Sequence, residues 1–293
     1  MSIKTVLDCI KNEFSQRKRS TQERIYNDKK IEERLRQIQF DDISESFPKE
    51  FFILDFDPLY SFYRIIRRRD VALFSSTCSK DSYLSGLLDN LFKEKEIGKK
   101  QLFFSDFSGV LNSKDSGKYS FADFKKEQFE RNISDPHYKD YKTLRHHIFD
   151  IDEYGNSNVI KDALILKWSN TIYAYNSDRS HRFALLCEWN DSDKQNDSEI
   201  FDVTELSINV ENKNKFQENY YGFIVSENTA NEIFNAYTDN SFMNWQIYCP
   251  FPYAGNGNMV GLIFQNIKSN KNIINIFKNS KNSVNINDLL IAY

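Results

Sequence analysis

The chain has 293 residues, of which 40% are hydrophobic and 28% charged, so it can bury a core and is not disordered by composition. A formal net charge of −3 provides no global attraction to nucleic acid, and nine glycines and five prolines exclude collagen-like or long linker segments. The four cysteines lie far apart without a C-x-x-C pair, which argues against zinc sites, iron–sulfur sites and a disulfide framework.

The first part of the chain is rich in charge and has apolar residues at helical spacing. The apolar residues at positions 3, 6, 7 and 10 predict an amphipathic helical arm. Within it, residues 15–36 form a basic segment. Its charges either lie on a solvent-exposed helix face or contact nucleic acid or a protein partner. No apolar stretch matches a secretory leader or the roughly 18 residues of a membrane span, so we expect a cytoplasmic protein with no membrane partner.

A second basic stretch, residues 64–69, follows a predicted buried strand at 51–56. Aromatic residues and arginines alternate in "YRIIRRR", a combination that can stack on bases and pair with phosphates but that also fits a helix with one basic face. Short helices are expected over 79–92 and 122–131. Between them we expect "KEKEIGKK" to be a charged break and "QLFFSDFSGVL" to be a strand and turn.

From about residue 147 the pattern changes to short strands and helices. The runs "NVIKDALILKW" and "TIYAYN" are bridged by Ser169-Asn170, which predicts a hairpin. The later elements are expected in the order helix "SHRFALLCEW", strand "IFDVTELSINV", strand "YYGFIV" with Ser226 capping a helix, an Asn-Gly turn and strand in "YAGNGNMVGLIFQNI", and two short terminal helices. The elements predict an α+β fold, with a helix-rich region at 1–145 and a mixed α/β domain at 146–293.

The turn "NSDRSHR", residues 176–182, concentrates polar residues between an apolar strand and an apolar helix. The first turn of a helix has free N–H groups and a partial positive charge, which suit a phosphate or another anion. Ser180 is a suitable N-cap, and it would place His181 and Arg182 in the first turn.

Cations in that first turn repel the positive end of the helix dipole, so their presence is explained if they share a bound anion. In that interpretation Arg182 and Arg179 clamp the anion, and Asp178 orients a cation or accepts a hydrogen bond from a ligand hydroxyl. The alternative is a structural turn in which His181 and Arg182 are satisfied by carboxylates or carbonyls. Both interpretations stay open from the residues alone.

A second polar stretch, "RHHIFDIDE" at 145–153, holds two histidines and three carboxylates, the ligand types of zinc, manganese or iron. Adjacent histidines on one element point apart, so we expect a polar loop that enters the domain and no metal site. No G-x-x-x-x-G-K-[ST] motif occurs, which excludes a P-loop.

The stretch "DRSHRFA" and its upstream hairpin resemble the D-G-x-H-R turn of the ParB/sulfiredoxin-like superfamily, and also an uncharacterised bacterial family with an S-H-R-F-A motif. The resemblance covers roughly residues 147–240. It implies a ParB/sulfiredoxin-like core in which Ser180, His181 and Arg182 lie nearest to the phosphates of a nucleotide. The family's glycine is Arg179 here, where it either blocks the phosphate or adds a ligand. Ser180 stands where the reductase has its catalytic cysteine, which excludes sulfiredoxin activity.

The resemblance implies a nucleotide-binding protein that hydrolyses a nucleoside triphosphate or transfers a phosphoryl or nucleotidyl group. ATP or another triphosphate is then the cofactor, with Mg²⁺. His181 and Asp178 would carry the catalysis, while Ser180, Arg179, Arg182 and Lys167 would join His181 in binding the nucleotide. The alternative is a non-catalytic scaffold with a degenerate ParB-like domain that binds nucleic acid or protein through 15–36 and 64–69. The many Asn and Lys residues are typical of AT-rich bacterial or phage genes, where either function would serve phage–host conflict.

Overall fold

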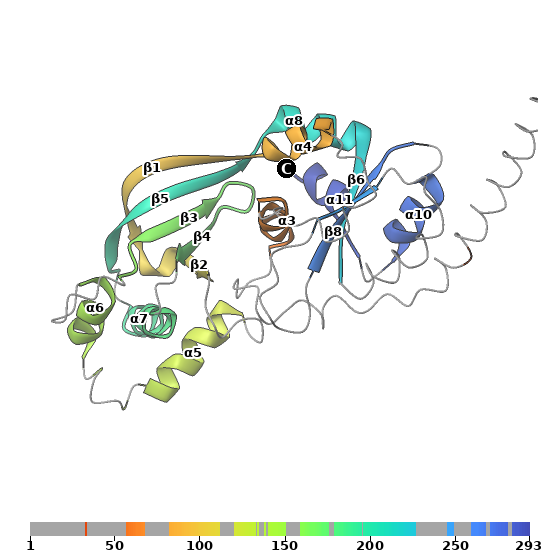
Figure 1. Cartoon of the computed structure of the whole chain (residues 1–293). Coiled ribbons are helices and arrows are strands. Elements are labelled where there is room, and N and C mark those ends of the chain that lie inside the picture. The colour runs from red at the N-terminus through yellow and green to blue at the C-terminus, as the bar shows by residue number, and fades with distance from the viewer. Residues whose placement is uncertain are drawn as a thin grey trace, which may run out of the picture.

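The protein is an α+β molecule with two sheets and helices on both sides of the larger one (Figure 1). The computed structural model describes Glu33 and residues 57–67, 82–111, 120–132, 134, 138, 140–150, 159–175, 179–194, 196–226, 245–248, 259–267, 270–280 and 283–293. Among these residues, no helix is both long enough and apolar enough to cross a membrane.

The larger sheet, sheet A, has five strands in the order β1-β5-β3-β4-β2. Its strands pair antiparallel between β1 and β5 and between β3 and β4, and parallel between β3 and β5 and between β2 and β4. Their bounds are Phe92–Phe103 for β1, Phe107–Leu111 for β2, Asp162–Leu166 for β3, Thr171–Tyr175 for β4 and Ser198–Ile208 for β5. The β3–β4 hairpin is confirmed, and Asn170 in its turn has φ 54°, a left-handed conformation that asparagine tolerates.

Three helices cover one face of sheet A, namely α5 (Phe121–Asn132), α6 (Tyr141–Phe149) and α7 (Ser180–Ser192). Figure 1 shows them together below the sheet. Alternation along β3 explains the layer, because Ala163 and Ile165 pack toward these helices. Phe183 of α7 lies at the centre of the aromatic core between the layers, fully buried against Phe107 at 5.0 Å between ring centroids.

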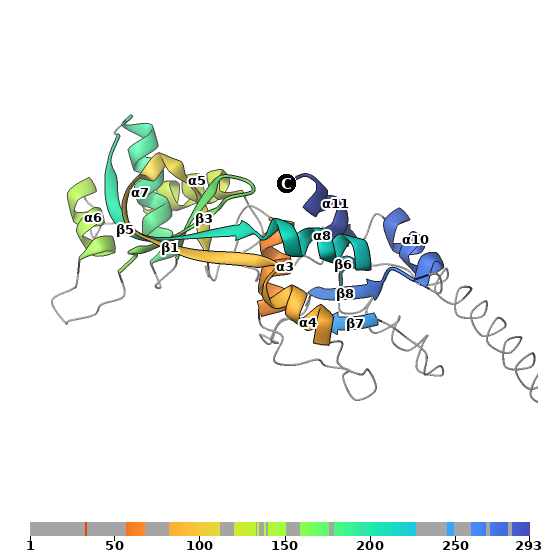
Figure 2. The same cartoon turned by 90° about the horizontal axis from the view of Figure 1, so that it is seen from above.

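The opposite face of sheet A is partly covered by α3 (Pro58–Arg67). Leu164 and Leu166 of β3 point to this side and pack in one core with Leu59 and Phe62 of α3. The same core continues into the second sheet through Ile224 and other residues. Figure 2 shows α3 between the two sheets. One helix therefore joins them through a shared apolar interior.

The second sheet, sheet B, is antiparallel, with strand order β7-β8-β6-β9. Its strands and accompanying helices are α4 (Ser82–Asp89), α8 (Val210–Asn219), β6 (Tyr220–Ser226), β7 (Trp245–Tyr248), β8 (Met259–Gln265), α10 (Lys271–Asn279), β9 (Val284–Asn285) and α11 (Ile286–Ile291). The buried amide of Asn287 bridges β6 and α11: its Oδ1 accepts from Gly222 N at 2.9 Å and its Nδ2 donates to Tyr220 O at 2.8 Å. This satisfies backbone groups that sheet pairing leaves open.

The predicted division between residues 145 and 146 is wrong. It falls inside α6, and sheet A takes β1 and β2 from before that point and β3, β4 and β5 from after it. The predicted charged break at 93–100 is also wrong, because these residues form most of β1. An edge strand with exposed side chains tolerates Lys and Glu, and a bulge at 96–98 twists it.

The other predicted elements have mixed outcomes. The helices at 79–92 and 122–131 and the strands in "IFDVTELSINV" and "YYGFIV" are confirmed as α4, α5, β5 and β6, while α8 was not predicted. Four predictions lie outside the described residues: the strand at 51–56, the helix after Ser226, the Asn-Gly turn at 256–257, and the N-terminal arm apart from Glu33, which is helical.

Candidate functional site

The candidate site is the start of α7, which β4 reaches through residues 176–178. The helix begins at Ser180, and Arg179 is the N-cap residue with no capping hydrogen bond from its side chain. The prediction that Ser180 caps the helix is therefore wrong by one residue. The backbone carbonyl of Arg179 already accepts the first helical hydrogen bond, from Phe183 N at 3.0 Å. Ser180 is buried, whereas His181 is exposed.

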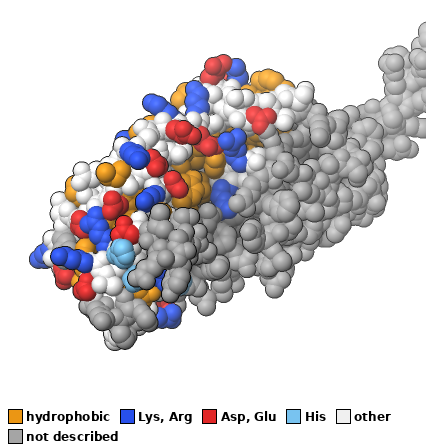
Figure 3. Space-filling view, turned by 60° about the vertical axis from the view of Figure 1, so that its left-hand side comes forward, with side chains coloured by type: hydrophobic (Ala, Val, Ile, Leu, Met, Phe, Trp, Pro, Cys, Tyr) orange, Lys and Arg blue, Asp and Glu red, His pale blue; other side chains and the backbone are white. Residues whose placement is uncertain are grey.

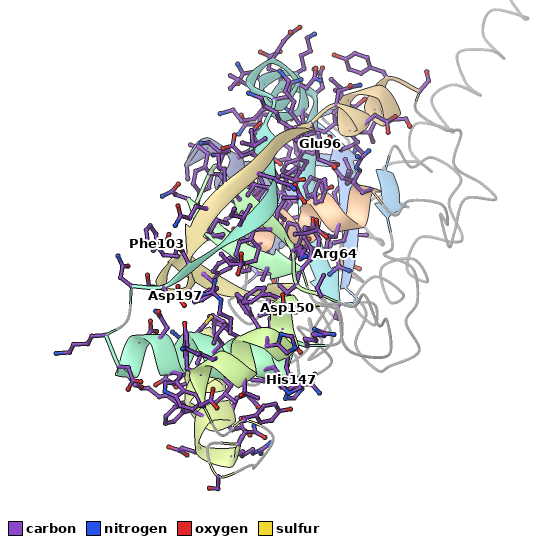
Figure 4. The ribbon with its side chains drawn as sticks, turned by 90° about the vertical axis from the view of Figure 1, so that its left-hand side faces the viewer. Arg64, Glu96, Phe103, His147, Asp150 and Asp197 are labelled. Atoms are coloured by element: carbon purple, nitrogen blue, oxygen red, sulfur yellow. The ribbon has the colours of Figure 1, made fainter. Side chains whose placement is uncertain are left out.

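Arg179 is committed to the end of α6. Its side chain is 6% exposed, and its Nη1 donates to the backbone carbonyls of His147 and, at 3.3 Å, Asp150. Figure 4 labels these two α6-end residues close to each other. Carbonyls at a helix C-terminus carry partial negative charge, which suits a buried guanidinium. In this structure Arg179 binds the end of α6 to the start of α7, and its predicted contact with a phosphate stays a prediction.

His181 is held by a residue of α5. Its Nδ1 lies 2.9 Å from Oε1 of Gln128, and its ring packs edge-on against Phe124 at 5.5 Å between centroids. A carbonyl oxygen accepts only, so Nδ1 carries the hydrogen and Nε2 has the lone pair in the neutral ring. Gln128 is 2% exposed, and its own Nε2 has no hydrogen-bond partner in the part of the chain that the structure describes. The sequence therefore places a buried polar side chain directly beside the first turn of α7.

Arg182 is the arginine of this turn whose guanidinium is only partly engaged by the described residues. It is half-buried, its Nε donates to the hydroxyl of Tyr138 at 2.9 Å, and its guanidinium carbon lies 5.8 Å from the centroid of the Tyr138 ring. The Tyr138 ring in turn lies edge-on to His147, 6.4 Å between centroids. Within the described residues, no carboxylate pairs with Arg182. The hydroxyl of Tyr138 is therefore its hydrogen-bond partner at the positive end of a helix.

One predicted site residue, Lys167, lies elsewhere. Lys167 is next to the β3–β4 turn, at the opposite end of β4 from α7, and its Nζ is 3.8 Å from Oε1 of Glu205. The fold does not bring it to the site. Lys161, which directly precedes β3, lies at the end of the hairpin that leads to α7. Asp178 is outside the described residues.

The first residues of the histidine-rich stretch, 145–149, form the last turns of α6. The loop predicted there is therefore wrong. His146 pairs with Asp150 four residues on, at 2.6 Å and with both side chains more than half exposed, while the adjacent His147 turns toward Tyr138. Within the described residues, no group of three or more His, Cys, Asp or Glu side chains could hold a metal ion. Figure 3 shows histidine side chains gathered at the end of the molecule that α5–α7 form.

An ion-pair network fixes α6 against sheet A. Arg145 pairs with Asp197 at 2.5 Å and with Glu199 at 2.8 Å, and Tyr141 donates to Asp197 at 3.0 Å. Burial alone would raise the pKa of the Asp197 carboxyl, but hydrogen bonds from the Ser198 backbone, Tyr141 and Arg145 together lower it. The network positions the α6 carbonyls that Arg179 binds.

Two arginines of the second basic segment, Arg64 and Arg67, belong to α3. Arg64 is 8% exposed, and Arg67 pairs with Glu94, which also accepts from the hydroxyl of Tyr63 at 2.7 Å. Burial and this hydrogen bond raise the pKa of Tyr63 to about 12. Arg64 is thus buried and Arg67 is paired with a carboxylate, while residues 68–69 lie outside the described residues. The predicted nucleic-acid contact of this segment stays a prediction.

Comparison of the chain with protein-family models, with curated proteins and with solved structures finds no match. The ParB/sulfiredoxin-like resemblance therefore stays a prediction. The function has to be argued from the geometry of the site.

Proposed function

We propose that this protein binds a phosphate-bearing ligand, foremost a nucleoside triphosphate such as ATP, at the first turn of α7. Arg182 supports the proposal most directly. A cation at a helix N-terminus is unfavourable by about 0.3–1 kcal/mol, and a bound phosphate offsets this cost because it is attracted to both the cation and the helix end. In the described residues neither Nη atom of Arg182 has a hydrogen-bond acceptor, and Tyr138 engages Nε alone. The Nη edge is the edge that takes two phosphate oxygens.

His181 supplies the second group of the proposed site. Gln128 fixes the Nδ1–H tautomer, so Nε2 is the nitrogen that exchanges a proton in acid–base chemistry. We assign His181 this role in hydrolysis or transfer of a phosphoryl or nucleotidyl group, with Asp178 as the carboxylate that orients a cation or accepts a hydrogen bond from a ligand hydroxyl. The nucleotide phosphates would bring Mg²⁺ with them, since this ion is commonly held by phosphates and few protein groups.

The remaining residues of the proposed site are chosen by position. The first-turn amides, beginning with Ser180, contribute the helix dipole. Lys161 replaces Lys167 as the accessory cation, because Lys161 lies at the α7 end of the hairpin. Arg179 has a positioning role, because its side chain binds backbone carbonyls at the end of α6 and so holds the start of α7 in place.

A melting-temperature screen tests the proposal. Wild-type protein is heated with ATP, GTP, CTP or pyrophosphate, with and without Mg²⁺, beside Arg182→Ala and the control Arg131→Ala. Arg131 is an exposed α5 arginine whose partner is Glu127. A ligand at about 100 times its Kd stabilises by about 2.7 kcal/mol, which is a shift of several degrees. We expect that shift in wild type and Arg131→Ala and its loss in Arg182→Ala. No shift with any ligand, or a shift that survives Arg182→Ala, would sink the proposal.

A further inference from the structure

Among the described residues, no helix covers one face of sheet A along the outer parts of β1 and β5. Six residues that the strand register places on this side define the open face: Glu96, Lys99, Phe103, Asp162, Ile200 and Asp202. Ile200 is 56% exposed and Phe103 is 36% exposed, although both are large and apolar. Figure 4 shows Glu96 and Phe103 along the same long strand. The open face therefore combines apolar and charged side chains.

The charges of the open face are unbalanced. Glu96, Asp162 and Asp202 form no ion pair among the described residues, and Lys99 is the one cation in the set that defines the face. Asp162 and Asp202 stand directly opposite each other on β3 and β5. Like charges in direct register destabilise a sheet. A cationic occupant would convert that repulsion into attraction.

We infer that residues 15–36 of the same chain dock on the open face. This segment has eight Lys and Arg against four Asp and Glu, a net charge of 8 − 4 = +4. Its apolar residues, which include Ile25, Ile31 and Leu35, match the exposed Phe103 and Ile200. Its arginines can also lie over the Phe103 ring. Opposite charge and matching apolar surface thus occur within one molecule.

The chain enters sheet A at the β3–β4 turn, which is the opposite end of β3 from Asp162 of the open face. Asp57, at the start of α3, accepts hydrogen bonds at Oδ2 from Trp168 Nε1 at 2.9 Å and from Ser169 Oγ at 3.3 Å, in the β3–β4 turn. Residues 37–56 connect the basic segment to this point. A connection of that length spans up to roughly 70 Å, at about 3.3–3.6 Å per residue. Tethering then gives an effective concentration on the order of millimolar.

Carbodiimide cross-linking of the full chain, read by mass spectrometry, tests the inference. The reagent joins a lysine to a carboxylate that it touches, without a spacer. We expect links from Lys18, Lys29 or Lys30 to the three open-face carboxylates, with yields that fall about tenfold in 1 M salt as surface charges are screened. The α5 residue Glu130, exposed on the other side of sheet A, is the internal reference. Links to Glu130 at equal yield, or no links to the open face, would overturn the inference.

Two further arms sharpen the result. In Asp162→Asn/Asp202→Asn, links to Glu96 should fall about fivefold, the effect of losing about 1 kcal/mol of attraction, whereas Glu130→Gln should leave them unchanged. Circular dichroism confirms that both variants are folded. A mixture of ¹⁵N-labelled and unlabelled protein should give links within one chain. Links between chains would contradict the assignment to the same chain and point to a second copy.

Discussion

The guanidinium of Arg179 donates to the backbone carbonyl of His147, so a buried arginine at the start of α7 closes the end of α6. The resembling family has glycine at this position. Here the side chain contributes to the packing of the helical layer. The two arginines of the turn therefore have different roles. Arg179 holds the turn in place, and Arg182 provides the positive charge of the proposed site.

Replacing Arg179 by Gly should destabilise the protein, although it restores the residue of the resembling family. The change removes hydrogen bonds from a charged donor to the α6 carbonyls, each worth about 1.5–3 kcal/mol, and leaves those carbonyls unpaired. We expect the free energy of unfolding to fall by about 2–4 kcal/mol. Urea unfolding followed by circular dichroism measures it. A variant as stable as wild type would show that Arg179 has no structural role.

Replacing Gln128 by Met should raise stability and weaken ligand binding. The substitution removes a buried amide N–H group that has no partner in the described residues, which favours folding by about 1 kcal/mol. It also removes the acceptor that orients His181, so the Kd for ATP should rise about fivefold. Urea unfolding and calorimetric titration give the two values. If stability falls and binding is unchanged, Gln128 is a packing residue alone.

A matched pair of glycines tests the core of sheet A. A Cβ at Gly109 would lie 2.9 Å from two ring carbons of the buried Tyr173, whereas a Cβ at Gly86 in α4 would meet nothing within 4 Å. We expect Gly109→Ala to cost about 1–3 kcal/mol through overpacking. Gly86→Ala should gain about 0.5–1 kcal/mol by favouring the helix. Thermal unfolding of both variants checks the signs, and equal effects would contradict the packing described for β2 and β4.

The Arg145–Asp197 pair should make stability depend on pH in the acid range. The pKa of Asp197 is lower in the folded protein than its ordinary value of about 4, so near this pH the folded state binds fewer protons than the unfolded state. The contribution of the Asp197 carboxylate to the free energy of unfolding is therefore complete above about pH 5, and it is lost as the pH falls through the folded-state pKa. The stability difference between wild type and Asp197→Asn should shrink on acidification. A difference that stays constant down to about pH 2 would contradict this.

Several elements of the fold were accessible to sequence reasoning because their pattern is strong. The β3–β4 hairpin, α7, β5 and β6 combine apolar runs with turn or cap residues. The strand β1 was missed because an exposed edge strand made of Lys and Glu has the composition of a loop. The helix α8 was missed because Phe216 is its one buried residue, too little for a periodic signal.

The candidate site could be predicted only in part. The sequence located His181 and Arg182 at a helix start, but their partners Gln128 and Tyr138 come from segments 53 and 44 residues away. No local pattern marks such contacts. The same holds for Arg179, whose partners are backbone carbonyls of another helix. Lys167 was wrongly assigned to the site. Which end of the β3–β4 hairpin lies near α7 depends on how the strands pair, and no local sequence pattern shows this.

The most direct test of the central claim is a titration of ¹⁵N-labelled protein with ATP, followed by NMR. We predict saturable shifts of the backbone amide signals of Ser180, His181 and Arg182 and of the Arg182 Nε–H signal, and their loss in Arg182→Ala. Shifts confined to other parts of the chain, or no shifts at millimolar ATP, would contradict a phosphate site at the start of α7.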